Sequence, residues 1–222
     1  DSIRKEIEKL GYPVIVKPVH LGSSIGVEIV KTEGDLIRSV ETAFRYDNHI
    51  LVEEVISPLM EINCSVMGSS LQSKTSVCER PLGKEELLSF RDKYMSDESG
   101  KGMASADRII PADISEELSS SIQELSKKIF RILLCSGLAR LDFLVNAKTE
   151  EFYFNEINTI PGSFSFYLWK ETGLSFSGLL TGLIDLAIEE HRNKKRRIQS
   201  YETNLLSQKA VTGLKGTKYM KK

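Results

Sequence analysis

The residues with the clearest chemical meaning are two carboxylates, Asp142 and Glu156, which a tight hairpin would place opposite one another. The apolar segment 137–146 predicts a buried strand, and segment 151–158 predicts a strand that returns beside it after a short polar turn. A turn centred on Thr149 pairs Asp142 with Glu156. Two carboxylates in such a position repel each other unless a positive charge lies between them.

The same pairing puts Arg140 opposite Asn158, and the alternation of a strand then turns all four polar side chains to one face. The opposite face is expected to receive Leu141, Phe143, Tyr153 and Ile157. Two carboxylates and an amide carbonyl are hard oxygen ligands, which suit Mg²⁺ held partly by phosphate oxygens. The alternative is a surface hairpin whose charges merely align, but the flanking residues are too apolar for a solvated ribbon. We therefore predict a metal site at Asp142, Glu156 and Asn158.

A glycine-rich loop, residues 22–26, lies between two predicted strands and follows Lys17 closely. Glycines let the backbone approach an anion, and successive N–H groups and serine hydroxyls donate to phosphate oxygens. The loop matches neither the P-loop nor the dinucleotide fingerprint, so a plain turn would explain it if it stood alone. A lysine that ends an apolar strand beside the loop can neutralise phosphate charge, which favours a phosphate-binding role.

Two acids, Glu53 and Glu54, lie inside an otherwise apolar segment, 50–56, that predicts a strand. One interpretation is an edge strand whose acids are solvated. The other is a connecting segment whose backbone N–H and C=O groups contact an adenine edge, while Glu61 accepts hydrogen bonds from ribose hydroxyls. The residues alone leave both interpretations open.

The composition of the 222 residues is that of a globular protein, 41% hydrophobic and 27% charged, with a formal net charge of −1. This length supports one sizeable core or two small lobes. No apolar run approaches the roughly 20 residues of a membrane span and no N-terminal signal is recognisable, so we expect a cytoplasmic protein without a membrane segment. The three cysteines fit reduced core thiols, and the three histidines share no motif, so we expect no histidine-rich metal site.

Basic residues are concentrated at the C-terminal end. Residues 192–222 contain ten Lys or Arg and a single acid, Glu202. Such a segment could contact nucleic acid or an anionic surface, but it lacks regularly interleaved aromatic residues. We interpret residues 196–222 as a solvated basic tail and do not expect nucleic acid as a partner. The oligomeric state stays open, a homodimer included.

Helical and strand patterns mix along the chain, which predicts an α+β fold. Helices are expected over 2–10, 34–46, 115–135 and 177–192, and further strands over 14–17, 27–31, 61–67 and 71–79. Gly11 is expected to end the first helix, and Asp113 and Glu116 to form a capping box for the third. The polar segment 82–110 is long for a connection, which favours a lid. Because the chain opens inside a helical pattern, we expect a piece of a longer protein.

Seven blocks follow one another along the chain: residues 11–18, 22–26, Glu53, 61–68, 93–97, 140–142 and 155–162. In this order they resemble the ATP-grasp superfamily and, within it, the D-alanine–D-alanine ligases, over residues 5–192. The resemblance implies two α+β lobes whose antiparallel sheets sandwich a nucleotide. The ATP-grasp domain would span residues 1–195, with a smaller nucleotide-covering lobe over 1–56, a larger catalytic lobe over 57–195 and the lid over 82–110.

The resemblance also implies roles for individual residues around ATP. The phosphates would be contacted by Lys17, Ser24 and Lys93. The adenine and ribose would be contacted by Glu53, Glu54, Ile56 and Glu61. Ser23 and Tyr94 would close the loop over the site, and Arg140 with the Gly162 backbone would stabilise a tetrahedral intermediate. Two Mg²⁺ ions, for which Mn²⁺ can substitute, would be held by Asp142, Glu156 and Asn158.

The implied activity is the ATP-dependent joining of a carboxylate to an amine through an acyl phosphate, with D-alanine or a similar amino acid as substrate, in peptidoglycan precursor synthesis. The alternatives are a ligase for another amino or hydroxy acid and a nucleotide-binding module without catalysis. Two departures from the family pattern stand out. The family's N-terminal domain is missing, and Tyr167 lies where a serine would bind the second substrate, within the aromatic stretch Phe164–Trp169.

Overall fold

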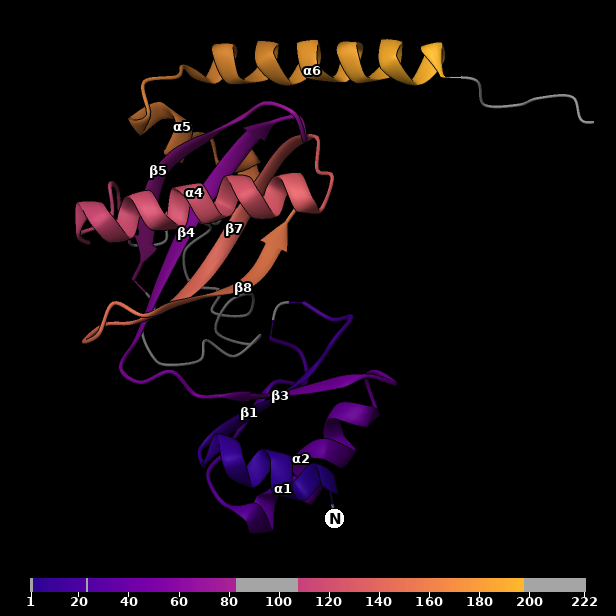
Figure 1. The fold of residues 1–222 in the computed structure, drawn as a ribbon, viewed down its shortest axis with the longest axis vertical. Helices are drawn as coiled ribbons and strands as arrows, with labels where there is room; N and C mark the ends of the chain where they lie inside the picture. Colours follow the sequence, from indigo (N-terminus) through magenta and orange to yellow (C-terminus); the bar gives the residue numbers. More distant parts are fainter. Residues whose placement is uncertain (1, 23, 83–107, 198–222) are drawn as a thin grey trace, which may run out of the picture. The chain divides into compact units, whose positions relative to one another are not determined.

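The computed structural model describes residues 2–22, 24–82 and 108–197. In this part of the chain, helices and strands mix in an α+β arrangement built on antiparallel sheets, as the sequence predicts (Figure 1). Residues 1–186 make up one compact unit and residues 187–222 a second. No helix among the described residues is long and apolar enough to cross a membrane.

The first sheet has the strand order β2-β1-β3. Its strands are β1 (Val14–Pro18), β2 (Glu28–Val30) and β3 (Ile50–Glu54), and its helices are α1 (Ser2–Leu10) and α2 (Glu33–Phe44). Apolar residues of both helices and of the strands form one core: Ile7, Val14, Val16, Val30, Leu36 and Ala43. Because successive side chains of a strand alternate, burying Val14 and Val16 turns Lys17 to the other face of the sheet.

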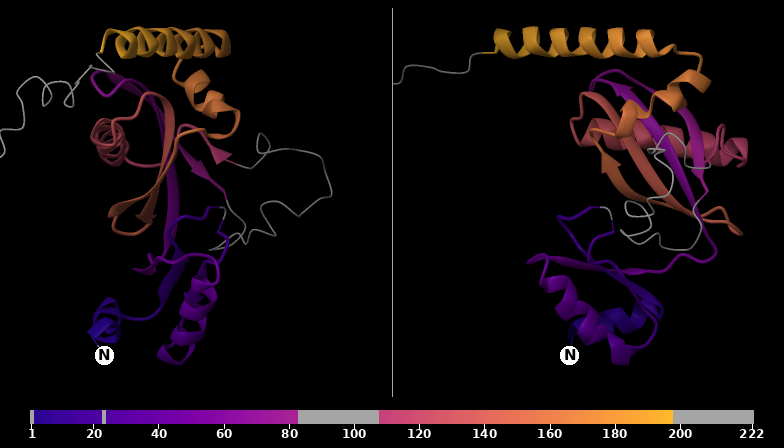
Figure 2. Two further views of the ribbon diagram at one scale, coloured as in Figure 1. Left: turned by 90° about the vertical axis from the view of Figure 1, so that its right-hand side faces the viewer. Right: turned by 180° about the vertical axis from the view of Figure 1, so that it is seen from behind.

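The second sheet has the strand order β6-β5-β4-β7-β8. Its strands are β4 (Leu59–Gly68), β5 (Ser73–Pro81), β6 (Arg108–Ile109), β7 (Gly137–Asn146) and β8 (Phe152–Asn158). Helix α4 (Glu116–Ile132) covers one face, where Ile122 and Phe130 pack with Leu141 and Phe143 in a fully buried core. Figure 2 (left) shows this helix end-on beside the sheet.

The other face of the second sheet is covered only in part. A short 3₁₀ turn, η2 (Gly162–Ser165), leads into α5 (Phe166–Glu171) and then α6 (Phe176–Arg196). Trp169 of α5 packs with Met67, Leu138 and Leu179, and its indole N–H donates to Ser65 Oγ at 3.0 Å. This contact holds α5 against β4 and leaves the neighbouring polar positions of the face for other partners.

The predicted ends of two helices have different outcomes. Gly11 ends α1 as expected, with φ +74° and its N–H donating to Glu8 O at 3.1 Å. The capping box at Asp113 and Glu116 is wrong, because the N-cap is Ser115, whose hydroxyl accepts the Leu118 N–H at 3.1 Å. Asp113 instead makes an ion pair with Arg80 at 3.0 Å.

Candidate functional site

The hairpin of β7 and β8 has the predicted pairing at its functional end. Asp142 lies opposite Glu156, and Arg140 lies opposite Asn158. The register then shifts, so that Phe143 pairs with Phe154 and not with Asn155. Asn155 is therefore the extra residue of a β-bulge, which the uniform alternation of the sequence did not reveal.

The bulge corrects one expected side-chain direction. Leu141 and Phe143 lie in the core, but Tyr153 does not, because it is 53% exposed. The bulge moves the alternation by one residue, so Phe152 and Phe154 contact the Phe143 ring instead, with centroids 6.1 and 6.0 Å apart.

Lys17 lies where the two sheets contribute polar groups to one place. Its ammonium pairs with Glu53 Oε2 at 2.6 Å and donates to Asn155 Oδ1 at 3.3 Å. The lysine, the acid of β3 and the bulge residue of β8 are thus brought together by the fold. Strand β3 lies at the edge of its sheet and Glu54 is exposed, which fits the interpretation of an edge strand with solvated acids. Glu53 does not fit it, because its carboxylate is paired with Lys17.

The glycine loop contains two residues, Ser24 and Gly26, with left-handed backbone conformations. Ser24 has φ +58°, and the N–H groups of Ile25 and Val27 donate back to Gly22 O at 3.2 Å and Ser24 O at 3.3 Å. At Gly26, with φ +73°, an added Cβ would lie 2.9 Å from both Pro18 Cγ and Tyr46 Cδ2. Glycine is required there by both space and backbone conformation.

Four polar side chains form a row across adjacent strands of the second sheet, which we call the acidic row: Glu79, Asn63, Asp142 and Glu156. The pairings Glu79 with Asn63, Asn63 with Asp142 and Asp142 with Glu156 make each residue a direct cross-strand neighbour of the next. Cross-strand neighbours point to the same face, so the row lies opposite α4. The predicted metal ligands therefore continue into two residues, Asn63 and Glu79, that sequence analysis missed.

Arg140 and Asp142 form the tightest charged contact of this face. The guanidinium donates from Nε to Oδ1 and from Nη2 to Oδ2, each at 2.7 Å. Burial works against the charge on Arg140, but the hydrogen bonds and charge of Asp142 outweigh it and raise the pKa of Arg140 above its ordinary value. The guanidinium thus supplies the positive charge that two facing carboxylates require.

The oxygen atoms of this face fit a magnesium site. Glu156 is exposed, and within the described part of the chain neither it nor Asn158 makes a side-chain hydrogen bond or ion pair, so their oxygens remain available. Asp142 has its oxygens on the same face, hydrogen-bonded to Arg140. Two carboxylates and an amide are the ligand types that Mg²⁺ takes beside phosphate.

Glu79 is the centre of a buried cluster at the other end of the acidic row. It is 2% exposed, accepts from Asn63 Nδ2 at 3.1 Å and from the Tyr167 hydroxyl at 3.0 Å, and pairs with Arg108 Nη1 at 3.1 Å. The Arg108 guanidinium also lies 4.1 Å from the centre of the Tyr167 ring. Burial, and next the charge of Glu79, raise the pKa of Tyr167. We call Glu79, Arg108 and Tyr167 the Glu79 cluster.

The remaining predicted residues are distributed as follows. Glu61 is exposed on β4, two positions before Asn63 and therefore on the same face, and Ile56 is half-buried after β3. Gly162 begins η2, in which Ser163, Phe164 and Ser165 all have φ near +50°. Ser23, Lys93, Tyr94 and most of the predicted lid and tail lie outside the described residues.

The aromatic stretch Phe164–Trp169 both packs the following helices and reaches the site face. Phe166 contacts the rings of Tyr167 and Phe176, and Trp169 is buried. Tyr167 differs from these, because its hydroxyl reaches the Glu79 carboxylate.

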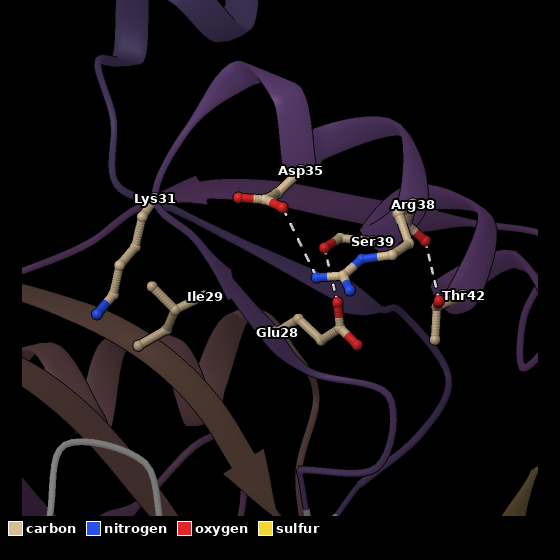
Figure 3. A pocket seen from close by; sticks show the side chains of 7 residues that line it. All are labelled: Glu28, Ile29, Lys31, Asp35, Arg38, Ser39 and Thr42. Atoms are coloured by element: carbon tan, nitrogen blue, oxygen red, sulfur yellow. Dashed lines mark hydrogen bonds and ion pairs between the residues drawn. The ribbon is translucent and has the colours of Figure 1, made fainter.

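A separate hollow lies between β2 and α2 (Figure 3). Several of its polar groups are paired with one another: Ser39 donates to Glu28 at 2.6 Å, and Arg38 lies 3.8 Å from Asp35. It contains none of the predicted site residues, so we assign it no ligand.

Comparison with known proteins gives a consistent result. A family model described as the C-terminus of D-ala D-ala ligase matches residues 1–185. The D-alanine–D-alanine ligase of Thermosipho melanesiensis is 42% identical over 203 residues, covering 91% of this chain and 53% of that protein. The chain therefore spans about half the length of the curated relatives it matches.

Two solved structures have the same fold. The D-alanine–D-alanine ligase of Coxiella burnetii superposes with a TM-score of 0.70 at 29% identity, covering 95% of this chain and 52% of that one. The D-Ala:D-Ser ligase VanG of Enterococcus faecalis gives 0.69 at 34% identity, covering 83% and 52%.

Proposed function

Because the chain belongs to the D-alanine–D-alanine ligase family, whose C-terminal domain it matches, and has the ATP-grasp fold, we propose that it is the nucleotide-binding and catalytic part of an ATP-dependent carboxylate–amine ligase. The observation that carries the proposal is the acidic row with Arg140 beside Asp142. A module that only binds nucleotide needs the carboxylates but not a guanidinium held beside them.

In this proposal ATP lies between the two sheets' polar faces. Lys17 binds the α- and β-phosphates under the loop of Ser23 and Ser24, which is supported by its position between Glu53 and Asn155. The other nucleotide contacts are assigned to Glu53, Glu54, Ile56, Glu61 and Lys93. If Lys17 leaves Glu53 to contact the phosphates, the Glu53 carboxylate can accept a hydrogen bond from the adenine amino group.

Asp142, Glu156 and Asn158 would hold two Mg²⁺ ions, or Mn²⁺ in their place. Bound there, the ions supply positive charge to the phosphate oxygens and hold them in position. Arg140 has a second role, because its guanidinium can bind the developing oxyanion together with the Gly162 backbone N–H. The two bonds to Asp142 use two of the five guanidinium N–H groups, which leaves further donors for that purpose.

The reaction has two transfers. An oxygen of the first substrate's carboxylate attacks the γ-phosphorus of ATP, and ADP leaves with the electron pair of the broken P–O bond. The second substrate's amine then attacks the carbonyl carbon of the acyl phosphate, phosphate departs, and the amine loses a proton. Positioning and charge neutralisation dominate such a reaction. A lid over 82–110, carrying Lys93 and Tyr94, would exclude water from the acyl phosphate.

We further propose that the substrates are D-alanine or similar amino acids, that the setting is cytoplasmic peptidoglycan precursor synthesis, and that an N-terminal domain completes the first-substrate site. The lobes are assigned to 1–56 and 57–195, and 196–222 to a basic tail. A different second substrate is the alternative, because the Tyr167 hydroxyl donates to Glu79 and so cannot give that proton to a substrate carboxylate.

Isothermal titration with Mg²⁺ and a non-hydrolysable ATP analogue tests the nucleotide site. Glu156→Gln should weaken binding by at least about tenfold, because it removes the carboxylate that faces Asp142. Glu151→Gln is the matched control, since Glu151 is exposed at the turn end of the same hairpin and should leave affinity unchanged. Equal affinity of the Glu156 variant and the parent would refute the metal assignment.

A further inference from the structure

Two of the three histidines are brought together by the small sheet. His20 follows the end of β1 by two residues, and His49 directly precedes β3. The two segments continue the pairing of these strands, because Val19 N–H donates to His49 O at 3.0 Å. The rings lie with centroids 5.7 Å apart at 77°. No sequence motif links the two residues, so only the fold reveals that they are neighbours.

Asp47 completes the group, from the loop between α2 and β3. Its carboxylate lies 2.9 Å from His20 Nδ1 through Oδ2 and 3.1 Å through Oδ1. It also accepts backbone N–H groups of His20 at 2.7 Å and His49 at 3.1 Å. These backbone bonds, that of His20 first, hold the pKa of Asp47 well below its usual range, against the effect of burial. The contacts with His20 and His49 fix the orientation of the carboxylate.

The geometry points to a binding site for one divalent transition-metal ion of the Zn²⁺ type, formed by His20, Asp47 and His49. One ligand atom of each residue lies within 4.8 Å of the others. Two ligands of a tetrahedral zinc ion at about 2.0–2.1 Å lie about 3.3 Å apart, so only small side-chain rotations are needed. His20 has the freedom for them, because its side chain is 68% exposed.

The ligand set discriminates between this site and the acidic row. Two imidazoles and one carboxylate, with water in the fourth position, suit Zn²⁺, Ni²⁺ or Cu²⁺. Mg²⁺ prefers oxygen ligands and keeps its waters, so the Mg²⁺ that accompanies a nucleotide should not compete. The competing explanation is that Asp47 has a structural role only, because its carboxylate already accepts backbone hydrogen bonds that hold the loop.

The proposed zinc site lies next to both the glycine loop and strand β3. His20 lies two residues before Gly22, where the glycine loop begins, and His49 lies at the head of the strand that carries Glu53. A metal ion bound to both would tie the entry of the loop to β3. We expect Zn²⁺ to raise the Tm of the chain, because a ligand that binds only the folded state stabilises it.

Titration of the 222-residue chain with ZnCl₂, in buffer containing Mg²⁺, tests the proposal. One Zn²⁺ should bind per chain, and His20→Ala and His49→Ala should each weaken it about tenfold or more, since even residues that only support metal ligands typically contribute that much. His191→Ala is the matched control, as His191 is exposed on α6 outside the group. Cys135→Ser is measured too, because Cys135 is the one cysteine of the three that is not buried.

A second measurement uses the unmodified chain and therefore does not require that the variants fold. In ¹⁵N spectra of the histidine rings, Zn²⁺ should shift the signals of His20 and His49 and leave those of His191 in place. Unshifted rings, or equal affinity of the parent and both histidine variants, would overturn the proposal and leave Asp47 as a loop cap only. Neither result depends on ligase activity, so failure here is distinct from failure of the proposed function.

Discussion

Replacement of Glu79 by glutamine tests how much the buried Glu79 carboxylate contributes to the free energy of unfolding. The carboxylate is 2% exposed and accepts hydrogen bonds from Asn63 and Tyr167 on Oε1, while Oε2 faces Arg108. A glutamine carbonyl can keep the two bonds at Oε1, but its NH₂ group then meets the Arg108 guanidinium, a donor against a donor. The variant therefore removes the Glu79 carboxylate from beside the largely buried Arg108 guanidinium, whose side chain is 16% exposed.

The magnitude follows from this geometry. Removing one partner of a buried ion pair costs about 3–5 kcal/mol, and we expect about 2–3 kcal/mol in the free energy of unfolding because two of the bonds survive. Tyr167→Phe removes one hydroxyl donor but keeps the ring beneath Arg108, so it should cost about 1–2 kcal/mol. Glu124→Gln on the exposed side of α4 is the control, and it should change stability by less than about 0.5 kcal/mol.

Denaturant unfolding of the 222-residue chain gives these numbers, and a double-mutant cycle with Arg108→Gln apportions them. If the pair interacts as the structure has it, the cycle should give a coupling of about 1 kcal/mol or more. A Glu79→Gln cost no larger than that of Glu124→Gln, or a coupling near zero, would refute a buried ion pair at this end of the acidic row.

Two further outcomes are expected. Tyr167→Ser, made in the longest natural protein containing this chain, should change the ratios of kcat/KM among D-alanine, D-serine and D-lactate about ten- to a hundredfold. The change in these ratios should be larger than the change in the apparent affinity for ATP. Identical ratios in the variant and the parent would place Tyr167 outside the second-substrate site. In thermal unfolding, Gly26→Ala should lose about 1–2 kcal/mol of stability from the left-handed backbone alone. The control, Gly34→Ala in the first turn of α2, should be neutral or stabilising. Equal Tm values for the two variants would contradict the crowding at Gly26.

The sequence predicted the features that depend on local periodicity. The pairing of Asp142 with Glu156 follows from strand alternation and a short turn, both of which are written within residues 137–158. The bulge at Asn155 was not predictable in this way, because nothing in the alternation marks an extra residue. It places Phe152 and Phe154, in place of Tyr153, in contact with the Phe143 ring, and it turns Asn155 toward Lys17.

Several contacts of the two sites join residues that are far apart in the sequence, which sequence analysis could not pair. Glu79 lies 88 residues from Tyr167, which the sequence had marked for another role, and 29 residues from Arg108, and His20 is 27 residues from Asp47. A signal existed for Asn63, since it interrupts the mostly apolar strand β4 and a buried polar group requires a partner, whereas β5 is mostly polar and does not mark Glu79 in this way. The signal shows that a partner exists but does not identify it, because pairing at that range depends on the fold.

The distribution of charge along the acidic row explains how one sheet face could serve two kinds of ligand. At its β5 end Glu79 is matched by Arg108, and at its middle Asp142 is matched by Arg140, so neither carboxylate presents an unbalanced charge. At the β8 end, Glu156 has no ion-pair partner within the described ranges 2–22, 24–82 and 108–197. A divalent cation entering the face would therefore meet an uncompensated carboxylate at β8, whereas an uncharged or zwitterionic amino acid would meet a neutral surface near Glu79. Under the proposed function, this polarity favours the metal-bound nucleotide at the β8 end of the row and the second substrate at the Glu79 end.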